Sequence, residues 1–224
     1  MDPLAAAADS IIRAGRRLGA RGLISAGEGN ISVRLDADRL LVTPTGLRKD
    51  ELAPDDLVVV WLDHADREAF SRSGRGPTSD LAIHLAVYTA RPDIGAVAHA
   101  HLPAAMALTL AGEVPDPGAL PETALLLPRL PFLSLGIPGS VELADRIVAA
   151  LSDPGDPPEP LAPAVLLERH GAVAVGRDPD HAVDRLELVE VLCRTWRDAL
   201  LIRAARDSLG MVDGPSPGSQ SEGA

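Results

Sequence analysis

Apolar residues recur at helical spacing near the start of the chain and predict an amphipathic helix over residues 3–20. Gly22 follows as a stop signal. A longer amphipathic pattern over residues 180–206 predicts a second helix near the other end. Between them, short apolar runs alternate with turn-forming residues, which is typical of a sheet covered by helices.

Short β-like runs supply the strands of that sheet. The predicted strands are residues 30–35, 39–43, 57–62, 94–101, 129–133 and a pair, 164–168 with 172–175. Further helices are expected over residues 79–90, 103–110 and 140–151. Residues 111–121 are turn-rich and 152–163 form a Pro-rich loop. Few helices separate the strands, which argues against a doubly wound parallel sheet and favours a mixed or antiparallel one. We expect one domain over residues 1–208 and a disordered tail over 209–224, which is rich in Gly, Ser and Pro.

Composition narrows the class of protein. The 224 residues are 46% hydrophobic but only 2% aromatic, so the core must be aliphatic. A net charge of −11 makes nucleic acid a poor partner. The single cysteine, Cys193, suits a reducing compartment, and neither a secretory signal nor an 18-residue apolar run is found. We therefore expect a cytoplasmic protein without a membrane span.

Three histidines are the strongest chemical signal. His99 and His101 are two residues apart in a predicted strand, so their imidazoles point to the same face. His170 lies between two apolar runs and directly before Gly171, which permits a close backbone approach. Three histidine ligands leave an open coordination position, as in catalytic zinc sites. Imidazole ligands also permit Mn²⁺, Co²⁺ or Fe²⁺.

The other histidines are weaker candidates. His84 shares a helical face with Asp80, and a hydrogen-bonded packing role is favoured over metal ligation. His64 and His181 lie in polar surroundings and are expected to be solvated.

Three turn segments could bind an anion. They are Gly27–Asn30, Thr43–Gly46 and Gly76–Ser79, and each offers backbone N–H or hydroxyl donors. Thr78 and Ser79 also precede a predicted helix, whose N-terminus attracts negative charge. We expect an anionic small molecule, holding a phosphate or a carboxylate, as the substrate.

These motifs, in this order, resemble the class II aldolase/adducin family. The matching stretches are GEGNISVRL (27–35), LVTPTG (41–46), GPTSDLAIHLAVYTARPDIGAVAHAHLP (76–103) and LLERHGAVAVGRD (166–178). The resemblance covers about residues 5–205. It implies an α/β fold, a three-layer α/β/α sandwich around a mainly antiparallel sheet, and a homotetramer with active sites near the subunit interfaces.

The resemblance also implies roles for individual residues. Zinc ligands map onto His99, His101 and His170, and a catalytic carboxylate maps onto Asp80. Phosphate contacts map onto Asn30, Thr45, Gly46, Thr78 and Ser79.

Two departures from the family pattern affect the chemistry. The aldolases usually have Glu where this chain has Asp80, whereas the related ribulose-phosphate 4-epimerase is similar to this chain in having Asp. Family members also use a tyrosine near the C-terminus or from a neighbouring subunit, but the only tyrosine here, Tyr88, occupies a helical packing position. Glu122 is our candidate for the second acid, with a solvated loop glutamate as the alternative.

The sequence therefore predicts a metal-dependent, aldolase-type lyase that acts on a small sugar phosphate or related hydroxy-carbonyl compound through an enediolate. The ligands leave open whether the reaction is cleavage, epimerisation, decarboxylation or dehydration. A non-catalytic adducin-like protein and a purely structural metal site are the remaining alternatives.

Overall fold

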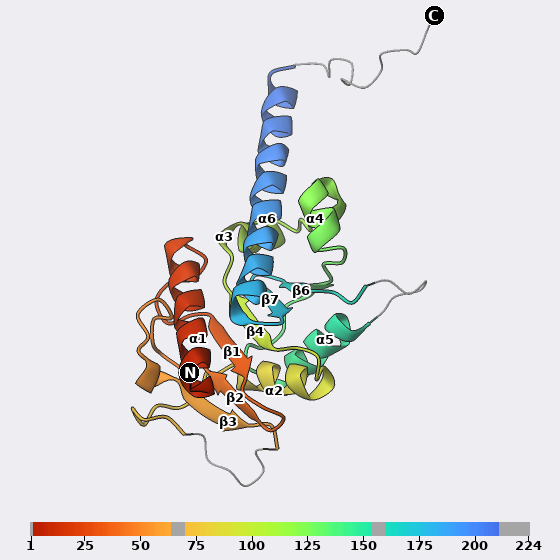
Figure 1. Ribbon diagram of the computed structural model, residues 1–224. Helices are drawn as coiled ribbons and strands as arrows, with labels where there is room; N and C mark the ends of the chain where they lie inside the picture. Colours follow the sequence, from red (N-terminus) through yellow and green to blue (C-terminus); the bar gives the residue numbers. More distant parts are fainter. Residues whose placement is uncertain (1, 64–69, 154–159, 211–224) are drawn as a thin grey trace, which may run out of the picture.

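A computed structural model describes residues 2–63, 70–153 and 160–210 of the chain (Figure 1). The α-helices of the described chain are α1 (Pro3–Ala20), α2 (Leu81–Ala90), α3 (Pro103–Leu110), α4 (Pro121–Leu126), α5 (Val141–Ser152) and α6 (Pro179–Ser208). Short 3₁₀ turns lie at Pro54–Asp56 and Pro117–Ala119. The strands are β1 (Asn30–Arg34), β2 (Arg39–Val42), β3 (Val58–Trp61), β4 (Ala96–Ala100), β5 (Phe132–Leu133), β6 (Ala164–Leu167) and β7 (Gly171–Gly176).

Each predicted helix and strand is present, with ends that differ by a few residues. One prediction is wrong: Glu122 lies in the first turn of α4 and not in a loop. This helix is six residues long, too short to show a helical period. The predicted tail beyond residue 210, the middle of the Pro-rich loop (154–159) and His64 lie outside the described residues.

The strands form one sheet in the order β3-β2-β1-β4-β7-β6-β5. All neighbours are antiparallel except β5 and β6, which are parallel. The mainly antiparallel sheet that the sequence predicts is therefore confirmed. Strand β4 lies at its centre, between β1 and β7, and carries His99.

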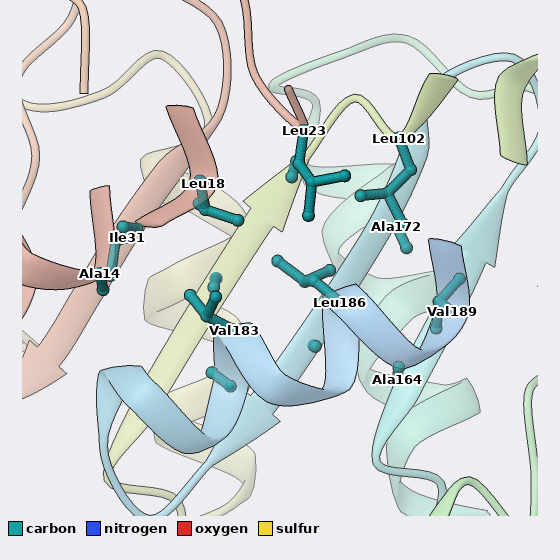
Figure 2. Close-up of a cluster of buried hydrophobic side chains, with 14 of the residues drawn as sticks. Ala14, Leu18, Leu23, Ile31, Leu102, Ala164, Ala172, Val183, Leu186 and Val189 are labelled. Atoms are coloured by element: carbon teal, nitrogen blue, oxygen red, sulfur yellow. The ribbon is translucent and has the colours of Figure 1, made fainter. Parts of the chain in front are cut away.

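Helices cover both faces of this sheet and complete a three-layer α/β/α sandwich. Helices α1, α3 and α6 share one aliphatic core with the sheet, part of which Figure 2 shows. Helices α2 and α5 pack against each other and form a second core on the opposite face. Along β4 the side chains alternate between the two: Ala96, Ala98 and Ala100 face the first core, and Val97 faces the second.

The helix ends follow from local chemistry. Asp2 accepts a hydrogen bond from the Leu4 N–H at 3.1 Å and precedes Pro3, which starts α1. At α6, Asp178 and Pro179 have the same roles. Within the described part of the chain, no helix is long and apolar enough to cross a membrane.

Candidate metal centre and anion pocket

The sheet register brings the metal-ligand candidates together at one end of the central strands. His99 is the fourth residue of β4 and pairs across the sheet with Asn30 at the start of β1. His101 directly follows β4, and His170 lies in the turn between β6 and β7. The imidazole centroids are 5.0 Å apart for His99 and His101, 4.7 Å for His99 and His170, and 4.8 Å for His101 and His170. The three predicted ligands thus form one cluster.

The turn that carries His170 requires its glycine. Gly171 has φ +87°, and a Cβ added there would lie 2.0 Å from the Ala100 carbonyl oxygen. The neighbouring Arg169 also has a positive φ of 55°. Its N–H donates to the Thr109 hydroxyl at 2.9 Å, which ties the turn to α3. The close approach expected of Gly171 is confirmed, and it sets His170 against the end of β4.

His99 has one ring nitrogen committed and one without a partner. Its Nδ1 lies 3.0 Å from the Ala172 carbonyl oxygen and must donate to it, because a carbonyl only accepts. Its buried Nε2 has no hydrogen-bond partner among the described residues. Burial, reinforced by His170 and His101, lowers the pKa of His99 to about 3. The ring is therefore neutral at pH 7, with a lone pair on Nε2.

His101 is oriented by a carboxylate. Its Nδ1 lies 3.0 Å from Glu28 Oε2, while the Ser25 N–H donates to Glu28 Oε1 at 2.7 Å. A carboxylate behind a ligand histidine fixes the ring tautomer and directs the other nitrogen toward a metal. In the sequence, Glu28 is one residue of the donor segment Gly27–Asn30, and nothing in that segment indicates its contact with His101.

The three imidazoles fit a divalent metal ion. One ligand atom from each histidine lies within 4.8 Å of the other two. Burial also lowers the pKa of His170, which favours the neutral form that a metal ion requires. An unpartnered, buried His99 Nε2 would cost free energy unless something binds it.

Asp80 lies beside this cluster, as predicted. It immediately precedes α2, and its exposed fraction is 7%. The Asn30 side-chain amide donates to Asp80 Oδ2 at 2.8 Å. Asp80 also has a favourable electrostatic interaction with His99 and His170, which raises the pKa of both and partly opposes the effect of burial. A nearly buried carboxylate next to an open metal position has the placement of a general acid or base.

One pocket joins the carboxylate, two of the histidines and the predicted anion donors. Its lining includes Asn30, Thr45, Thr78, Ser79, Asp80, His101 and His170. A pair of backbone hydrogen bonds, Thr78 N–H to the Thr43 carbonyl and Thr45 N–H to the Gly76 carbonyl, joins two of the turn segments. Gly46, also predicted to contact phosphate, has φ +72° in the adjacent turn and is not part of the lining.

Lys49 is a pocket residue that the sequence analysis missed. Its ammonium donates to the carbonyl oxygens of Gly27 and Leu47, each at 2.6 Å, and its exposed fraction is 1%. Burial lowers its pKa, and the nearby carboxylates of Asp80 and Glu28 oppose that shift. An ammonium has three donors, so one is left for an anion. In the sequence Lys49 lies in a run of charges, LRKDEL, that looks solvated.

The remaining candidates lie elsewhere. Glu122 is exposed on α4, which packs against α6 and the turn Pro117–Ala119, and it does not line this pocket. His84 is buried on α2, and both of its ring nitrogens are hydrogen-bonded, as expected. Tyr88 is also buried on α2, and His181 is half-buried at the start of α6.

Comparison with known proteins agrees with this architecture. The chain is 34% identical to methylthioribulose-1-phosphate dehydratase of Acidiphilium cryptum over 85% of this chain and 90% of that protein. It is 32% identical to 5-methylthioribulose-1-phosphate/5-deoxyribulose-1-phosphate aldolase of Rhodospirillum rubrum over 84% of this chain and 79% of that protein. The crystal structure of L-fuculose-1-phosphate aldolase from Thermus thermophilus superposes with a TM-score of 0.75 at 27% identity, covering 96% of this chain and all of the other.

The model of the class II aldolase and adducin N-terminal domain matches residues 9–197, which include every residue of the histidine cluster and the pocket described above. Enzymes named as dehydratases, aldolases and a decarboxylase are all similar to this chain. The family match and the fold agree, and the chain belongs to the class II aldolase/adducin family.

Proposed function

We propose that this protein is a zinc-dependent lyase that acts on a small ketose 1-phosphate. The observation that carries the proposal is that one pocket contains His101 and His170 of the metal cluster, the buried carboxylate of Asp80, and the anion donors around Lys49. That combination can hold a phosphate, a carbonyl group and a mobile proton at the same time.

Each group has a distinct role. Lys49 and the hydroxyls of Thr45, Thr78 and Ser79 bind the phosphate. A zinc ion held by the three histidines would supply Lewis-acid stabilisation of negative charge on the substrate oxygens. Asp80 moves the proton at the carbon or hydroxyl next to the carbonyl. Glu28 keeps the His101 ring in the orientation that ligation needs.

The names of the relatives support a ketose 1-phosphate as the substrate and suggest two reactions. Two of them are named for the same substrate, methylthioribulose 1-phosphate, one as a dehydratase and one as an aldolase. The dehydratase matches over nearly its full length with the higher identity, which favours elimination of water. In that reaction Asp80 takes a proton from the carbon next to the carbonyl and passes it to the hydroxyl on the following carbon, which leaves as water. The enol that forms becomes a diketone. Aldol cleavage, which the sequence analysis favours, is the second candidate.

A product assay tests the proposal. The zinc-loaded protein is incubated with 5-methylthioribulose 1-phosphate and, separately, with L-fuculose 1-phosphate, and products are identified by mass spectrometry. We expect turnover, with a product lighter by one water for elimination, or a three-carbon keto phosphate and an aldehyde for cleavage. Chelation of the metal should abolish turnover, and added Zn²⁺ should restore it.

The variant Asp80→Asn provides the control. It keeps the size of the side chain but removes its acid/base function, so turnover should fall by at least about 100-fold while metal content is retained. A protein that binds no metal and turns over neither substrate would overturn the proposal and favour an adducin-like binding role.

A further inference from the structure

A row of buried polar side chains leads from Asp80 away from the pocket and into the second core. The Asn30 amide nitrogen donates to Asp80 Oδ2 at 2.8 Å, and the Asn30 amide oxygen lies 2.7 Å from His84 Nε2. On the other side of the ring, His84 Nδ1 lies 2.6 Å from the Ser32 hydroxyl, which is 3.0 Å from the Tyr88 hydroxyl. The exposed fractions of these side chains lie between 0% and 7%.

The row follows from two simple periodicities. Asn30 and Ser32 are two residues apart on β1, so they share the sheet face that α2 covers. Asp80, His84 and Tyr88 are four residues apart, so they lie on one side of α2 and the residue before it. The strand face and the helix face interlock, and His84 meets both strand residues.

The hydrogen-bonding capacities fix a direction along the row. A carboxylate only accepts, so Asn30 must turn its NH₂ group to Asp80 and its oxygen to His84. The oxygen in turn requires a proton on His84 Nε2. A neutral imidazole then has a lone pair on Nδ1 for the Ser32 hydroxyl proton. Ser32 has one proton and could also donate to the Tyr88 oxygen at 3.0 Å, but the 2.6 Å contact with His84 Nδ1 is the shorter of the two.

The two amide orientations of Asn30 have almost the same shape, so packing alone does not choose between them. The reversed orientation would place the amide oxygen against Asp80 Oδ2, where two acceptors repel. Asp80 disfavours the reversed orientation at one end of the amide, and His84 Nε2–H favours the productive orientation at the other end.

We propose that His84 is a positioning residue for Asp80. Through Nε2–H it holds the Asn30 amide with NH₂ toward Asp80 Oδ2, which fixes the carboxyl group and leaves Oδ1 for the substrate. This inference rests on the proposed function, because it assigns a purpose to the orientation of a carboxylate that transfers a proton. A merely structural His84 would stabilise the fold and leave the chemistry unchanged.

Two substitutions at one position separate these roles. In His84→Gln the side-chain NH₂ can take the place of the Nε2–H donor, whereas His84→Leu has a similar volume and no donor. With zinc-loaded protein we expect His84→Leu to lower kcat by a factor on the order of 10 to 100, the range for lost support of a site residue, with little change in KM. His84→Gln should recover most of kcat.

A buried hydroxyl far from the pocket controls for general loss of stability. Thr123 is buried on α4 and donates to the Pro117 carbonyl at 2.6 Å. Thr123→Val should lower Tm without lowering kcat per metal-loaded protein. If His84→Leu behaves like Thr123→Val, or if His84→Gln is as impaired as His84→Leu, the positioning role is wrong.

A direct measurement on the wild-type protein does not need either variant to be active. Two-bond ¹H–¹⁵N NMR spectra of histidine-labelled, zinc-loaded protein report which ring nitrogen carries the proton, and the signals absent in His84→Gln identify His84. We expect the Nε2–H tautomer, and the Nδ1–H tautomer would overturn the inference.

The variants also separate this inference from the proposed function. Loss of turnover in Asp80→Asn together with normal kcat in His84→Leu would reject this inference alone. Normal turnover in Asp80→Asn would reject the acid/base role in the proposed function.

Discussion

At the residue scale, burial decides which polar groups have chemical roles. His99, Asp80 and Lys49 are all nearly inaccessible to water. Asp80 and Lys49 line the pocket, and His99 belongs to the histidine cluster whose other two members line it. A polar group removed from water without a full set of partners is costly, so such residues mark places where a ligand contributes to stability. Exposed ion pairs such as Arg48 with Asp50 carry little information of this kind.

The Lys49 ammonium should contribute to anion binding. Replacing it with Met keeps most of the length of the side chain but removes the charge and the N–H donors, so we expect KM for a phosphorylated substrate to rise about tenfold or more. Steady-state kinetics with the substrate of the product assay checks this. The adjacent Arg48 is half-exposed and pairs with Asp50 and Glu51, so Arg48→Met is a matched control that should leave KM unchanged. Equal KM values for Lys49→Met and wild type would contradict the assignment.

His84 should make stability depend on pH. Burial lowers its pKa from 6.5 in the unfolded chain to about 4 in the folded protein. The unfolded state therefore binds a proton at a pH where the folded state does not, so the contribution to stability is complete above pH 6.5 and is lost as pH falls toward 4. Between pH 7.5 and pH 5, wild type should lose about 2 kcal/mol more than His84→Gln. Urea unfolding of metal-free protein at both pH values measures this difference, and equal losses would refute it.

At the scale of the elements, most of the secondary structure was predictable because periodicity is local. The helix over 3–20 and the strands at 30–35 and 94–101 each have a clear apolar pattern. Helix α4 was missed because six residues do not complete two helical turns. Glu122 lies on that helix and does not line the pocket that contains Asp80. The role of Glu122 as a second acid stays a prediction.

The site was predictable only in part, for a related reason. The spacing of the histidines indicates metal ligation without any structure. His99 and His101 are two residues apart on a strand, and His170 directly precedes a glycine. Glu28, Lys49 and Asn30 acquire their roles from contacts between loops and strands that are distant in sequence. Nothing within a few residues of Lys49 indicates that its neighbours would be the carbonyl oxygens of Gly27 and Leu47.

The turn between β6 and β7 should tolerate no side chain at residue 171. Gly171→Ala combines a positive φ with a Cβ 2.0 Å from the Ala100 carbonyl oxygen. We expect a loss of stability of more than about 2 kcal/mol and weaker metal binding, because β4 or the His170 turn must move. Gly112→Ala is the control: its φ is +79°, but no atom lies within 4 Å of the added Cβ. It should cost only about 1 kcal/mol, the cost of the left-handed conformation. Similar losses in thermal unfolding for both variants would show that the contact with Ala100 is unimportant.

At the scale of the whole molecule, the outer part of α6 has no packing partner within the described chain that would cover its apolar side chains. The 30 residues of this helix extend well past the sheet, and its outer part bears exposed Leu201 and Ile202 (Figure 1). The resemblance to the family implies a homotetramer. We propose that this part of α6 contacts another copy of the chain, since exposed aliphatic side chains of this size are typical of interfaces.

Light scattering coupled to size-exclusion chromatography tests that proposal. Wild type should have the mass of four chains, and Ile202→Asp should reduce the assembly because a charge at an apolar contact is costly. A matched change at an exposed polar residue on another element, Thr89→Asp near the end of α2, should leave the mass unchanged. A monomeric wild type would contradict both the tetramer and this use of α6.

The order of the strands has a consequence for how the protein is made. Strand β1 is synthesised before β4 and can pair with it at once. The other neighbour of β4, strand β7, is synthesised only about seventy residues later. For that interval the central strand is an edge with unpaired backbone groups and apolar side chains, the state most exposed to aggregation. A nascent chain halted before residue 171 should therefore depend strongly on chaperones, whereas one that has released β7 should not.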